Sequence, residues 1–552
     1  MAIATTPRGV PYPEPGSGEP NNPPIHLKQQ AEWVDENVPK TADLADPETE
    51  AGALLAGSFA GKPTIDADDL AILMRDRTVA NGVSWTTPHE TIARVLGWAV
   101  VTDARYGGGA DNTGVDDSAA AVQAAHDSLP TSGGTVWFPA GTFKVGTAIT
   151  VTKPCAIRGT GPRTKIQTTS ATANIFTVSA GQVTIGHVAM SATVTRTAGW
   201  YVDVLSTASN FRIEHFTTAG AIGGVRTAAT SAAIAHGSIR DGTAGTGIAV
   251  RVDGGFAVAV EDITTDAAAQ TYAGIYVTNV GDLVIKDCQL LHAGTGLLVQ
   301  PGAGQSVTSL WAESTFFDNC TTGVSLSAAG GAIARSSFLR CWMGSATNWG
   351  VLMATSGAGT IDGTDFLGCH IFLNGSGGIA INAAAVSNTR IANCAICDNT
   401  GDAGILVNGA VSGLSITDNL IGAGFGLGGN GYGIFFNVTT VNDLIITDND
   451  LTGNTIAAIA GEPTSGTNRL IANNLGDTSR GATAGITVGA SPFTYTAGSR
   501  YETVYINAGT VSLVKVDGAS VFQQTNCAVR LAPGKSVEVT YTVAPGMSRT
   551  KD

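Results

Sequence analysis

An internal repeat of about 26 residues runs through the centre of the chain and constrains its fold more than any other feature. A glycine followed by alternating apolar residues returns at Gly224, Gly247, Gly274, Gly296, Gly323, Gly350, Gly378, Gly404 and Gly433. A second apolar series runs in phase with it through Ile157, Ile185, Ile213, Ala235, Val260, Ile285, Ala312, Ala334, Ile361, Ile391, Ile416, Ile446 and Ile471. Repeats of this length bury their apolar sides only by stacking on their neighbours.

The repeat has the size and composition of one coil of a parallel β-helix. It is too short for a propeller blade, and it lacks both a helical stretch and the Leu/Asn pattern of leucine-rich repeats. Glycine accounts for 71 of 552 residues and charged residues for only 13%, which suits short strands joined by tight turns. We therefore expect an all-β solenoid of about 13 coils.

Polar and sulfur-containing residues also recur with the repeat. Asn419, Asn449 and Asn474 each lie three residues after an anchor isoleucine, which predicts an asparagine ladder at a turn. Six of the eight cysteines lie within the repeats, and Cys394 and Cys397 have the spacing of a redox or zinc motif. Because no second pair or histidine cluster accompanies them, we interpret these cysteines as buried apolar residues and predict no metal site and no cofactor.

The charge balance excludes several partners. The chain carries 30 Lys and Arg against 44 Asp and Glu, a net charge of −14, which argues against nucleic acid and anionic membranes. No apolar run approaches the length of a membrane span, so we expect no membrane insertion. The first residues lack the basic and apolar regions of a signal peptide, and synthesis in the cytoplasm is expected.

The segment before the repeats contains an acidic turn, an alanine-rich stretch and a Pro-Ala-Gly turn. Asp116 or Asp117 is expected to cap a short helix with its buried side formed by Ala121, Val122, Ala125 and Leu129. Residues 101–145, which include Phe138-Pro-Ala-Gly-Thr-Phe143, closely resemble the opening segment of pectate-lyase-like phage tailspikes and related proteins. In those proteins this segment caps the first coil. The resemblance implies a right-handed parallel β-helix, but it transfers no active site.

Two further segments resemble phage tail proteins. Residues 8–38 are similar to the start of minor tail proteins of phages that infect actinobacteria, and residues 484–552 are similar to small C-terminal β domains of tail proteins. The resulting organisation is a Pro/Gly-rich peptide (1–24), a helical tail-attachment region (25–98), the β-helix (99–480, with its cap at 101–145) and a β-sandwich-like domain (484–552). The resemblance also implies a homotrimer in the virion, in the tail or tail tip, that contacts other tail proteins through residues 1–98.

Residues 311–365 are the predicted glycan-binding surface. Aromatic faces pack on sugars while arginines bond hydroxyls, and the candidates are Trp311, Trp342, Trp349, Arg335 and Arg340. The alternative is that the tryptophans fill the core or a trimer contact. If the protein cleaves glycans, the candidate carboxylates are Glu313, Asp318, Asp362 and Asp365. An outward-facing column of side chains with alternating charge is also expected, and this pattern indicates a salt-bridge ladder more than a catalytic acid/base pair. The column consists of Glu214, His236, Glu261, Lys286, Glu313, Arg335 and Asp362.

The leading functional hypothesis is a structural virion protein, a minor tail protein of tailspike or fibre type, that recognises a host cell-surface glycan during adsorption. The alternative is a host-glycan depolymerase, either a glycoside hydrolase or a polysaccharide lyase, on the same β-helix. A third hypothesis is a purely architectural spacer. The scarcity of carboxylates in the later repeats favours binding without cleavage.

Overall fold

The computed structural model describes residues 98–552 except 242–246, 425, 427 and 480, and the side chains of 241 and 267–271 are also outside the description. It further describes the backbone of two short antiparallel strands, β1 (Ile3–Thr5) and β2 (Pro11–Pro13). Apart from those strands, the predicted peptide at 1–24 and almost all of the predicted attachment region at 25–98 lie outside the described residues. The chain divides into Met1–Thr91 and Ile92–Asp552, and the second unit contains the β-helix and the C-terminal sheets.

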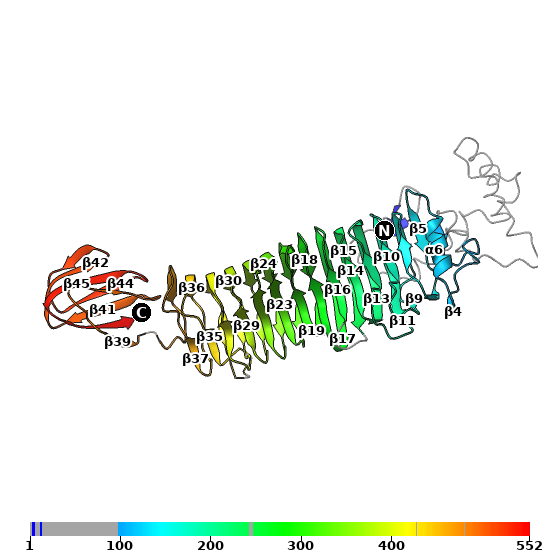
Figure 1. Cartoon of the computed structure of the whole chain (residues 1–552). Helices are drawn as coiled ribbons and strands as arrows, with labels where there is room; N and C mark the ends of the chain where they lie inside the picture. Colours follow the sequence, from blue (N-terminus) through cyan, green and yellow to red (C-terminus); the bar gives the residue numbers. More distant parts are fainter. Residues whose placement is uncertain are drawn as a thin grey trace, which may run out of the picture. The chain divides into compact units, whose positions relative to one another are not determined.

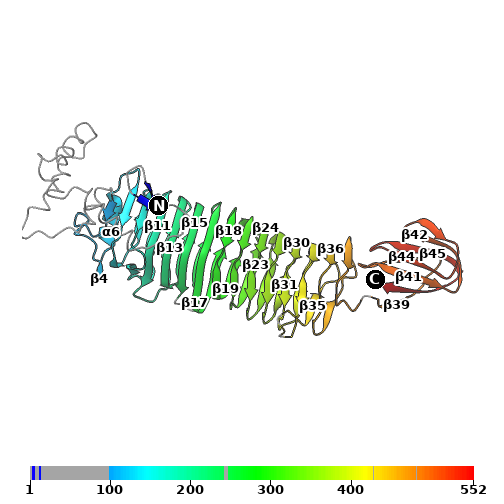
Figure 2. The ribbon, with the colours of Figure 1, turned by 180° about the vertical axis from the view of Figure 1, so that it is seen from behind.

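Parallel strands from β3 (Trp98–Val100) to β38 (Arg469–Ala472) form one continuous 36-stranded sheet. The sheet winds into a right-handed β-helix of about 13 coils, as Figures 1 and 2 show from opposite sides. The predicted fold class is therefore confirmed. Strand pairing between successive coils divides the β-helix into three faces, named here A, B and C.

Each face is a column of strands in register. Face A consists of β7 (Ile149–Val151), β10 (Phe176–Val178), β12 (Val202–Val204), β14 (Gly223–Thr227), β16 (Ile248–Val252), the C-terminal parts of β17 (Val258–Val277) and β19 (Gln289–Val299), β23 (Thr322–Ala329), β26 (Trp349–Ser356), β29 (Gly377–Asn382), β32 (Ala403–Val407), β35 (Tyr432–Phe436) and β37 (Ala457–Ala460). Face B consists of β3, β5 (Gly134–Trp137), β8 (Cys155–Arg158), the N-terminal parts of β11 (Val183–Ala192), β13 (Ser209–Ala221), β15 (Thr230–Asp241) and β17, then β18 (Leu283–Lys286), β20 (Ser306–Thr308), β21 (Leu310–Glu313), β24 (Ala332–Leu339), β27 (Thr360–Leu367), β30 (Val386–Ala392), β33 (Val411–Thr417), β36 (Asn442–Thr447) and β38. Face C consists of β4 (Thr113–Asp117), β6 (Gly141–Val145), β9 (Thr164–Thr168), the remaining parts of β11, β13, β15, β17 and β19, and β22 (Phe316–Asp318), β25 (Trp342–Gly344), β28 (His370–Phe372), β31 (Ala395–Cys397) and β34 (Leu420–Gly422).

Stacked apolar side chains fill the interior, because alternate residues of each strand point inward. One inward column of face B is fully buried and consists of Ile185, Ile213, Ile234, Val260, Ile285, Ala312, Phe338, Phe366, Ile391, Ile416, Ile446 and Ile471. The predicted series is wrong at three places, where it has Ala235, Ala334 and Ile361. Ala235 is the register partner of Glu214, and Ile361 belongs to a neighbouring inward column with Ile333 and Val386.

A column of hydrogen-bonding side chains follows this apolar column at the turn from face B to face C, and it is called the turn column here. It contains Cys288, Thr315, Cys341, Cys369, Cys394, Asn419, Asn449 and Asn474. Asn449 Nδ2 donates to Ile416 O and to Asn474 Oδ1, each at 2.9 Å, which confirms the predicted asparagine ladder. Cys394 Sγ donates to Phe366 O at 3.4 Å. Phe366 O occupies the same position relative to Cys394 as Ile416 O does relative to Asn449. These buried cysteines are free thiols and thus extend the ladder.

Immediately before the turn column, and before the equivalent position of the earlier coils from β11 onwards, each coil bends through one residue with a positive φ. That region is open to glycine and tolerated by Asn, Asp and His. The residues there are His187, His215, His236, Asp262, Asp287, Ser314, Arg340, Gly368, Asn393, Asp418, Asp448 and Asn473. The recurring polar residues at the repeat boundaries are therefore a consequence of backbone geometry.

A short helix closes the N-terminal end of the β-helix. Helix α6 (Ala119–Asp127) packs against β7 and β3 and buries Ala121, Val122 and Ala125. Its N-cap residue is Ser118, and the Asp117 Oδ1 atom accepts the Ala119 N–H at 2.9 Å. The predicted capping residue, Asp116 or Asp117, was therefore one or two positions too early, because both residues still belong to strand β4.

Two antiparallel four-stranded sheets form the C-terminal part. The first is ordered β39 (Thr483–Ile486), β46 (Gly546–Lys551), β41 (Glu502–Asn507) and β44 (Cys527–Leu531). The second is ordered β40 (Phe493–Thr496), β45 (Ser536–Val543), β42 (Thr510–Val516) and β43 (Ala519–Phe522). They enclose a core of their own, which includes Val504, Val514, Leu531 and Val539 and is separate from the core of the β-helix.

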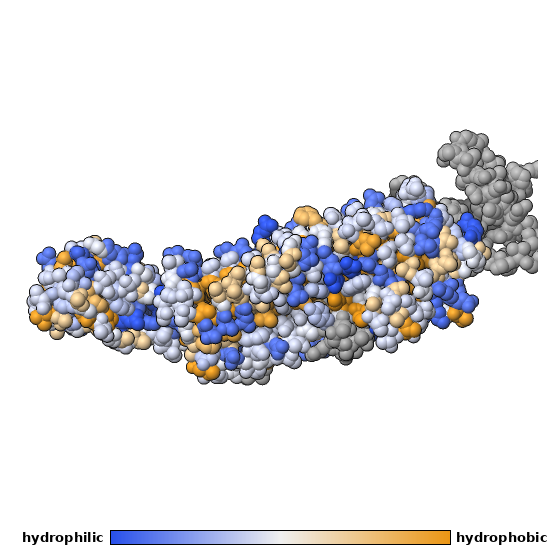
Figure 3. All heavy atoms as spheres, in the orientation of Figure 1, coloured by the Kyte–Doolittle hydropathy of each residue, from blue (hydrophilic) through white to orange (hydrophobic). Residues whose placement is uncertain are grey.

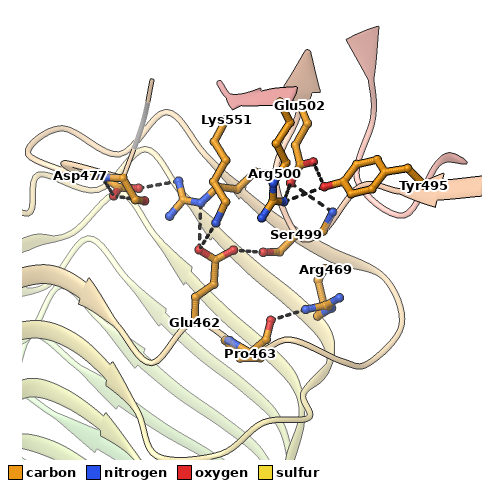
Figure 4. A network of polar contacts seen from close by, with 12 residues as sticks. Glu462, Pro463, Arg469, Asp477, Tyr495, Ser499, Arg500, Glu502 and Lys551 are labelled. Atoms are coloured by element: carbon orange, nitrogen blue, oxygen red, sulfur yellow. Dashed lines mark hydrogen bonds and ion pairs between the residues drawn. The ribbon is translucent and has the colours of Figure 1, made fainter. Parts of the chain in front are cut away.

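Polar contacts join this part to the last coil (Figure 4). The Arg500 side chain is only 2% exposed, and its Nε and Nη1 atoms lie 3.1 Å from Glu462 Oε2 and 2.6 Å from Asp477 Oδ2. Ser499 donates its hydroxyl to Glu462, while Lys551 Nζ lies 3.4 Å from the same carboxylate. The Ile471 N–H donates to Ser499 O at 2.7 Å. We call this set the charged junction.

Candidate functional site

Four successive strands of face A carry a row of large polar side chains. The register pairs Asp203 of β12 with Arg226 of β14, Arg226 with Arg251 of β16, and Arg251 with Tyr276 of β17. The next position along the row is Leu298 of β19. The flanking residues of each strand point into the core, so these four side chains occupy the outer side of face A.

The row is tied together by ion pairs around one carboxylate. Asp253 accepts from Arg226 Nε at 2.7 Å and from Arg251 Nε at 2.6 Å. The Thr278 hydroxyl adds a hydrogen bond of 3.0 Å to the same carboxylate. Arg226 also reaches Asp203, with 3.4 Å between Nη1 and Oδ1. A single guanidinium therefore contacts two carboxylates.

An open cavity of about 520 Å³ lies over Arg226, Arg251 and Tyr276 of this row. Its walls are formed by Arg226, Arg251, Asp253, Tyr276, Thr278, Gln300, Gly302, Gln305 and Ala329. The Arg251 guanidinium stacks over the Tyr276 ring at 5.0 Å, and the Tyr276 hydroxyl donates to Gln300 Oε1 at 3.1 Å. We call this cavity the face A groove. Figure 3 shows one side of the molecule, on which hydrophilic residues are interspersed with small apolar patches.

The two carboxyl groups bound by Arg226 have pKa values shifted in opposite directions, and only one of them, Asp253, lines the groove. Burial raises the pKa of Asp203, and the charge of Arg226 and the Asn174 amide offset this only in part. Burial also acts on Asp253, but hydrogen bonds from Arg251 and Arg226 outweigh it and lower its pKa. Carboxyl groups whose pKa values are driven apart in this way suit the separate roles of acid and anion.

The chemistry of the groove fits a polyhydroxylated ligand. Guanidinium N–H groups, a hydroxyl and two amides supply donors and acceptors, and a tyrosine ring supplies a flat apolar surface. This site was not predicted from the sequence, although the repeat contains a signal for it. Arg226, Arg251 and Tyr276 are spaced by 25 residues each, so they occupy one position of the repeat.

The predicted residues of 311–365 are distributed over all three faces. Trp311 is 54% exposed on β21 of face B, and Glu313 follows it on the same strand. Arg340 Nη2 contacts Glu313 Oε1 at 2.5 Å. The register stacks Trp311, Ser337, Asp365 and Arg390 in one column, so Trp311 and Asp365 lie on the same face B column, two coils apart, with Ser337 between them.

The other two tryptophans lie on different faces. Trp342, on β25 of face C, lies between Phe316 and His370, and its ring centroid is 5.8 Å from each of theirs. Its ring also packs edge-to-face with Phe372, with 4.4 Å between the ring centroids. Trp349 lies on β26 of face A against Gly377. The three tryptophans therefore do not form one platform.

The candidate carboxylates have separate surroundings. The Ser387 hydroxyl and the Asn388 amide both donate to Asp362, and these hydrogen bonds lower its pKa. Asp318 accepts the N–H of Asn319 at 3.0 Å. Arg335 occupies a bend with positive φ next to Gly363. None of these contacts joins two of the candidate acids.

The expected column of alternating charge is only partly correct. The register stacks Glu214, Ala235, Glu261, Lys286, Glu313 and Leu339. His236 lies at the adjacent bend, where it stacks on His215 and pairs with Asp262. Asp362 is the register partner of Ala334, in another column. The alternation is therefore limited to Glu261, Lys286 and Glu313.

The described part of the chain contains neither a metal-binding cluster nor a membrane-spanning helix. No group of three or more His, Cys, Asp or Glu residues is arranged to hold a metal ion there. No helix in that part is long and apolar enough to cross a membrane.

Comparison with known families identifies the class of the β-helix. Residues 106–344 match the family "Rhamnogalacturonase A/epimerase, pectate lyase-like", and residues 273–475 match "Right handed beta helix region". The chain thus contains pectate-lyase-like right-handed β-helix regions. No curated protein sequence matches it.

Solved structures with a similar fold include phage tailspikes. A tailspike protein mutant of E. coli bacteriophage HK620 is 10% identical over 88% of this chain and 100% of its own, with a TM-score of 0.50. The Dettilon tailspike protein is 10% identical over 87% of this chain and 99% of its own, also with a TM-score of 0.50. The A-module of a mannuronan C-5 epimerase of Azotobacter vinelandii is 15% identical over 68% of this chain and 99% of its own, with a TM-score of 0.43. At these identities the similarity concerns the fold.

Proposed function

We propose that this protein is a tail protein of a phage, of tailspike type, that binds a glycan on the host cell surface during adsorption. In this proposal it is a homotrimer in the virion, made in the host cytoplasm, and residues 1–98 attach it to other tail proteins. The face A groove carries the proposal, because it presents guanidinium, tyrosine and amide groups together on an open surface. The similarity of fold to tailspikes supports it.

Removing one groove arginine is expected to weaken glycan binding by about tenfold or more, which corresponds to the loss of about 1.4 kcal/mol or more from an arginine anchor. The variant is Arg251→Ala, and the matched control is Arg212→Ala, because Arg212 also pairs with a carboxylate at 2.6 Å but lies on face B. Binding is measured by affinity electrophoresis in gels that contain cell-envelope polysaccharide from actinobacterial strains. Equal binding by both variants contradicts a role for the groove.

Virion location and oligomeric state need their own measurements. Mass spectrometry of purified virions should detect the chain, and light scattering of the isolated protein should give three copies. A monomer that is absent from virions contradicts the tail-protein proposal whatever it binds.

Asp253, which lines the groove, and Asp203, which contacts the same Arg226 beside it, support a second candidate function, glycan hydrolysis. A glycoside hydrolase needs one protonated acid to donate to the leaving oxygen and one anion to stabilise the positive charge of the sugar ring. Asp203, whose pKa is raised, fits the first role, and Asp253, whose pKa is lowered, fits the second.

If the groove cleaves glycans, Asp203→Asn should reduce reducing-end release by about 100-fold or more, the usual contribution of a general acid. The wild-type rate should fall as the pH rises through the raised pKa of Asp203, and again at low pH as Asp253 becomes protonated. Glu313→Gln and Asp362→Asn are the comparison variants. Loss of release in these two variants but not in Asp203→Asn would move the active site to face B.

A further inference from the structure

The outer face of one C-terminal sheet carries exposed tyrosines among hydroxyl side chains. In β41, Val504 and Ile506 point into the core, so Thr503 and Tyr505 point outward. The register places Tyr505 between Ser548 of β46 and Ala528 of β44. It places Thr503 between Thr550 of β46 and Arg530 of β44, with Thr483 of β39 beyond Thr550.

The neighbours of Tyr505 leave its ring uncovered. Tyr505 is 38% exposed, and in the described part of the chain its side chain makes no hydrogen bond or ring contact. Tyr501, which immediately precedes the same strand, is 37% exposed. The Arg530 guanidinium lies 5.1 Å from the Tyr501 ring, and its charge is compensated by Asp552 at 3.1 Å.

We infer that this surface, formed by Tyr501, Thr503, Tyr505, Arg530, Ser548 and Thr550 and called the tyrosine face, is a second binding site and that its ligand is a neutral glycan. Exposed tyrosine rings pack on the C–H faces of sugars, and the surrounding hydroxyls both donate and accept hydrogen bonds. Tyr505 lies in β41 and Tyr501 immediately precedes that strand. At the rise of an extended chain, four residues span about 13 Å, so the two rings meet different sugar units of one chain.

Charge and area favour a neutral glycan over other occupants. The one arginine of the face is paired with Asp552, so an acidic polymer finds no free cation there. A stable contact with a second copy of the chain needs about 800 Å² from each partner and an apolar centre. Two separate rings among threonines and a serine do not provide that centre.

The test uses the full-length chain and its variants Tyr505→Ala, Tyr505→Phe and Phe522→Ala. Phe522 is the matched control, because it is 36% exposed on β43 of the other sheet. Each protein is run in affinity gels that contain dextran, mannan or arabinogalactan as neutral polymers, and in gels that contain polygalacturonate as the acidic one. Circular dichroism and light scattering verify that each variant is folded and has the wild-type oligomeric mass.

The expected result is that at least one neutral polymer retards the wild type, Tyr505→Phe and Phe522→Ala equally. Tyr505→Ala should weaken that binding by about tenfold, the effect of losing a central aromatic anchor. Polygalacturonate should not distinguish Tyr505→Ala from the wild type.

Three results overturn the inference: no neutral polymer retards the wild type, Tyr505→Ala binds as tightly as Phe522→Ala, or Tyr505→Ala alters the oligomeric mass. The third result would assign the face to a protein contact. The Arg251→Ala variant separates this inference from the groove. Retardation that is lost in Arg251→Ala but kept in Tyr505→Ala supports the groove alone, and the reverse pattern supports the tyrosine face alone.

Discussion

Replacing Asn449 with alanine is expected to lower the free energy of unfolding of the β-helix by about 3 kcal/mol or more, because each buried group left without a partner costs about 1–3 kcal/mol. The Asn449 side chain donates to Ile416 O, Thr447 O and Asn474 Oδ1, and its own oxygen accepts from the backbone and side chain of Asn419. Asn449 is 1% exposed, so water cannot replace these partners. The measurement is chemical denaturation followed by circular dichroism.

Two comparison variants make the Asn449 result specific. Asn437→Ala removes an exposed asparagine that donates a single hydrogen bond to Asn408, so a change below about 0.5 kcal/mol is expected. Asn449→Cys should retain part of the lost stability, because cysteines at equivalent positions donate to the preceding coil. Equal stability of Asn449→Ala and Asn437→Ala would contradict the importance of the turn column.

Replacing Arg500 with alanine is expected to detach the C-terminal domain from the last coil. The change leaves Asp477, whose side chain is 4% exposed, and Glu462 without their main cation. Breaking a buried ion pair by removing one partner costs about 3–5 kcal/mol. Hydrogen exchange should show faster exchange of the Ile471 amide, which donates to Ser499 O, and limited proteolysis should cut sooner near residues 476–482. Arg530→Ala removes an exposed pair and should change neither measurement.

The charged junction should also respond to pH. Burial raises the pKa of Glu462, but the charge of Arg500 and the Ser499 hydrogen bond outweigh it, and the net pKa is lowered. The contribution of Glu462 to stability is therefore complete above its ordinary value of 4.5 and is lost as the pH falls through its lower value in the folded protein. In Arg500→Ala this dependence on acid should diminish. An unchanged acid response in that variant would show that the junction is held by other contacts.

The repeat period determined the β-helix, but it did not determine which apolar residues stack. Face B has more than one inward column of β-branched or aromatic residues, and spacing alone does not distinguish Ile361 from Phe366. Both residues are buried and apolar. They are five positions apart, so choosing one or the other leaves the mean repeat period almost unchanged. The asparagine ladder was predictable because a buried asparagine has few structural roles in a repeat. The extension of the ladder through Cys394 and Cys369 was not predictable, because a buried cysteine in a repeat is read from the sequence as a small apolar residue.

The candidate site was harder to predict because aromatic residues close in sequence diverge around a coil. Trp311, Trp342 and Trp349 are separated by at most 38 residues, yet they lie on faces B, C and A. Residues that meet on one face are instead about one repeat apart, as Arg226, Arg251 and Tyr276 are. The interactions of Asp253 with two arginines depend on side-chain directions at the end of a strand, which the repeat pattern does not specify.

The direction of the hydrogen bonds between coils has a mechanical consequence. In a parallel β-helix these bonds run along the stacking axis, so tension applied between α6 and the C-terminal domain loads the coils in series. Each coil then bears the full force, and the weakest contact along the axis yields first. The charged junction is a contact of this kind, made by side chains and one strand end, whereas the coils are joined by ladders on three faces. Under tension, the C-terminal domain should therefore separate as a folded unit before any coil unwinds.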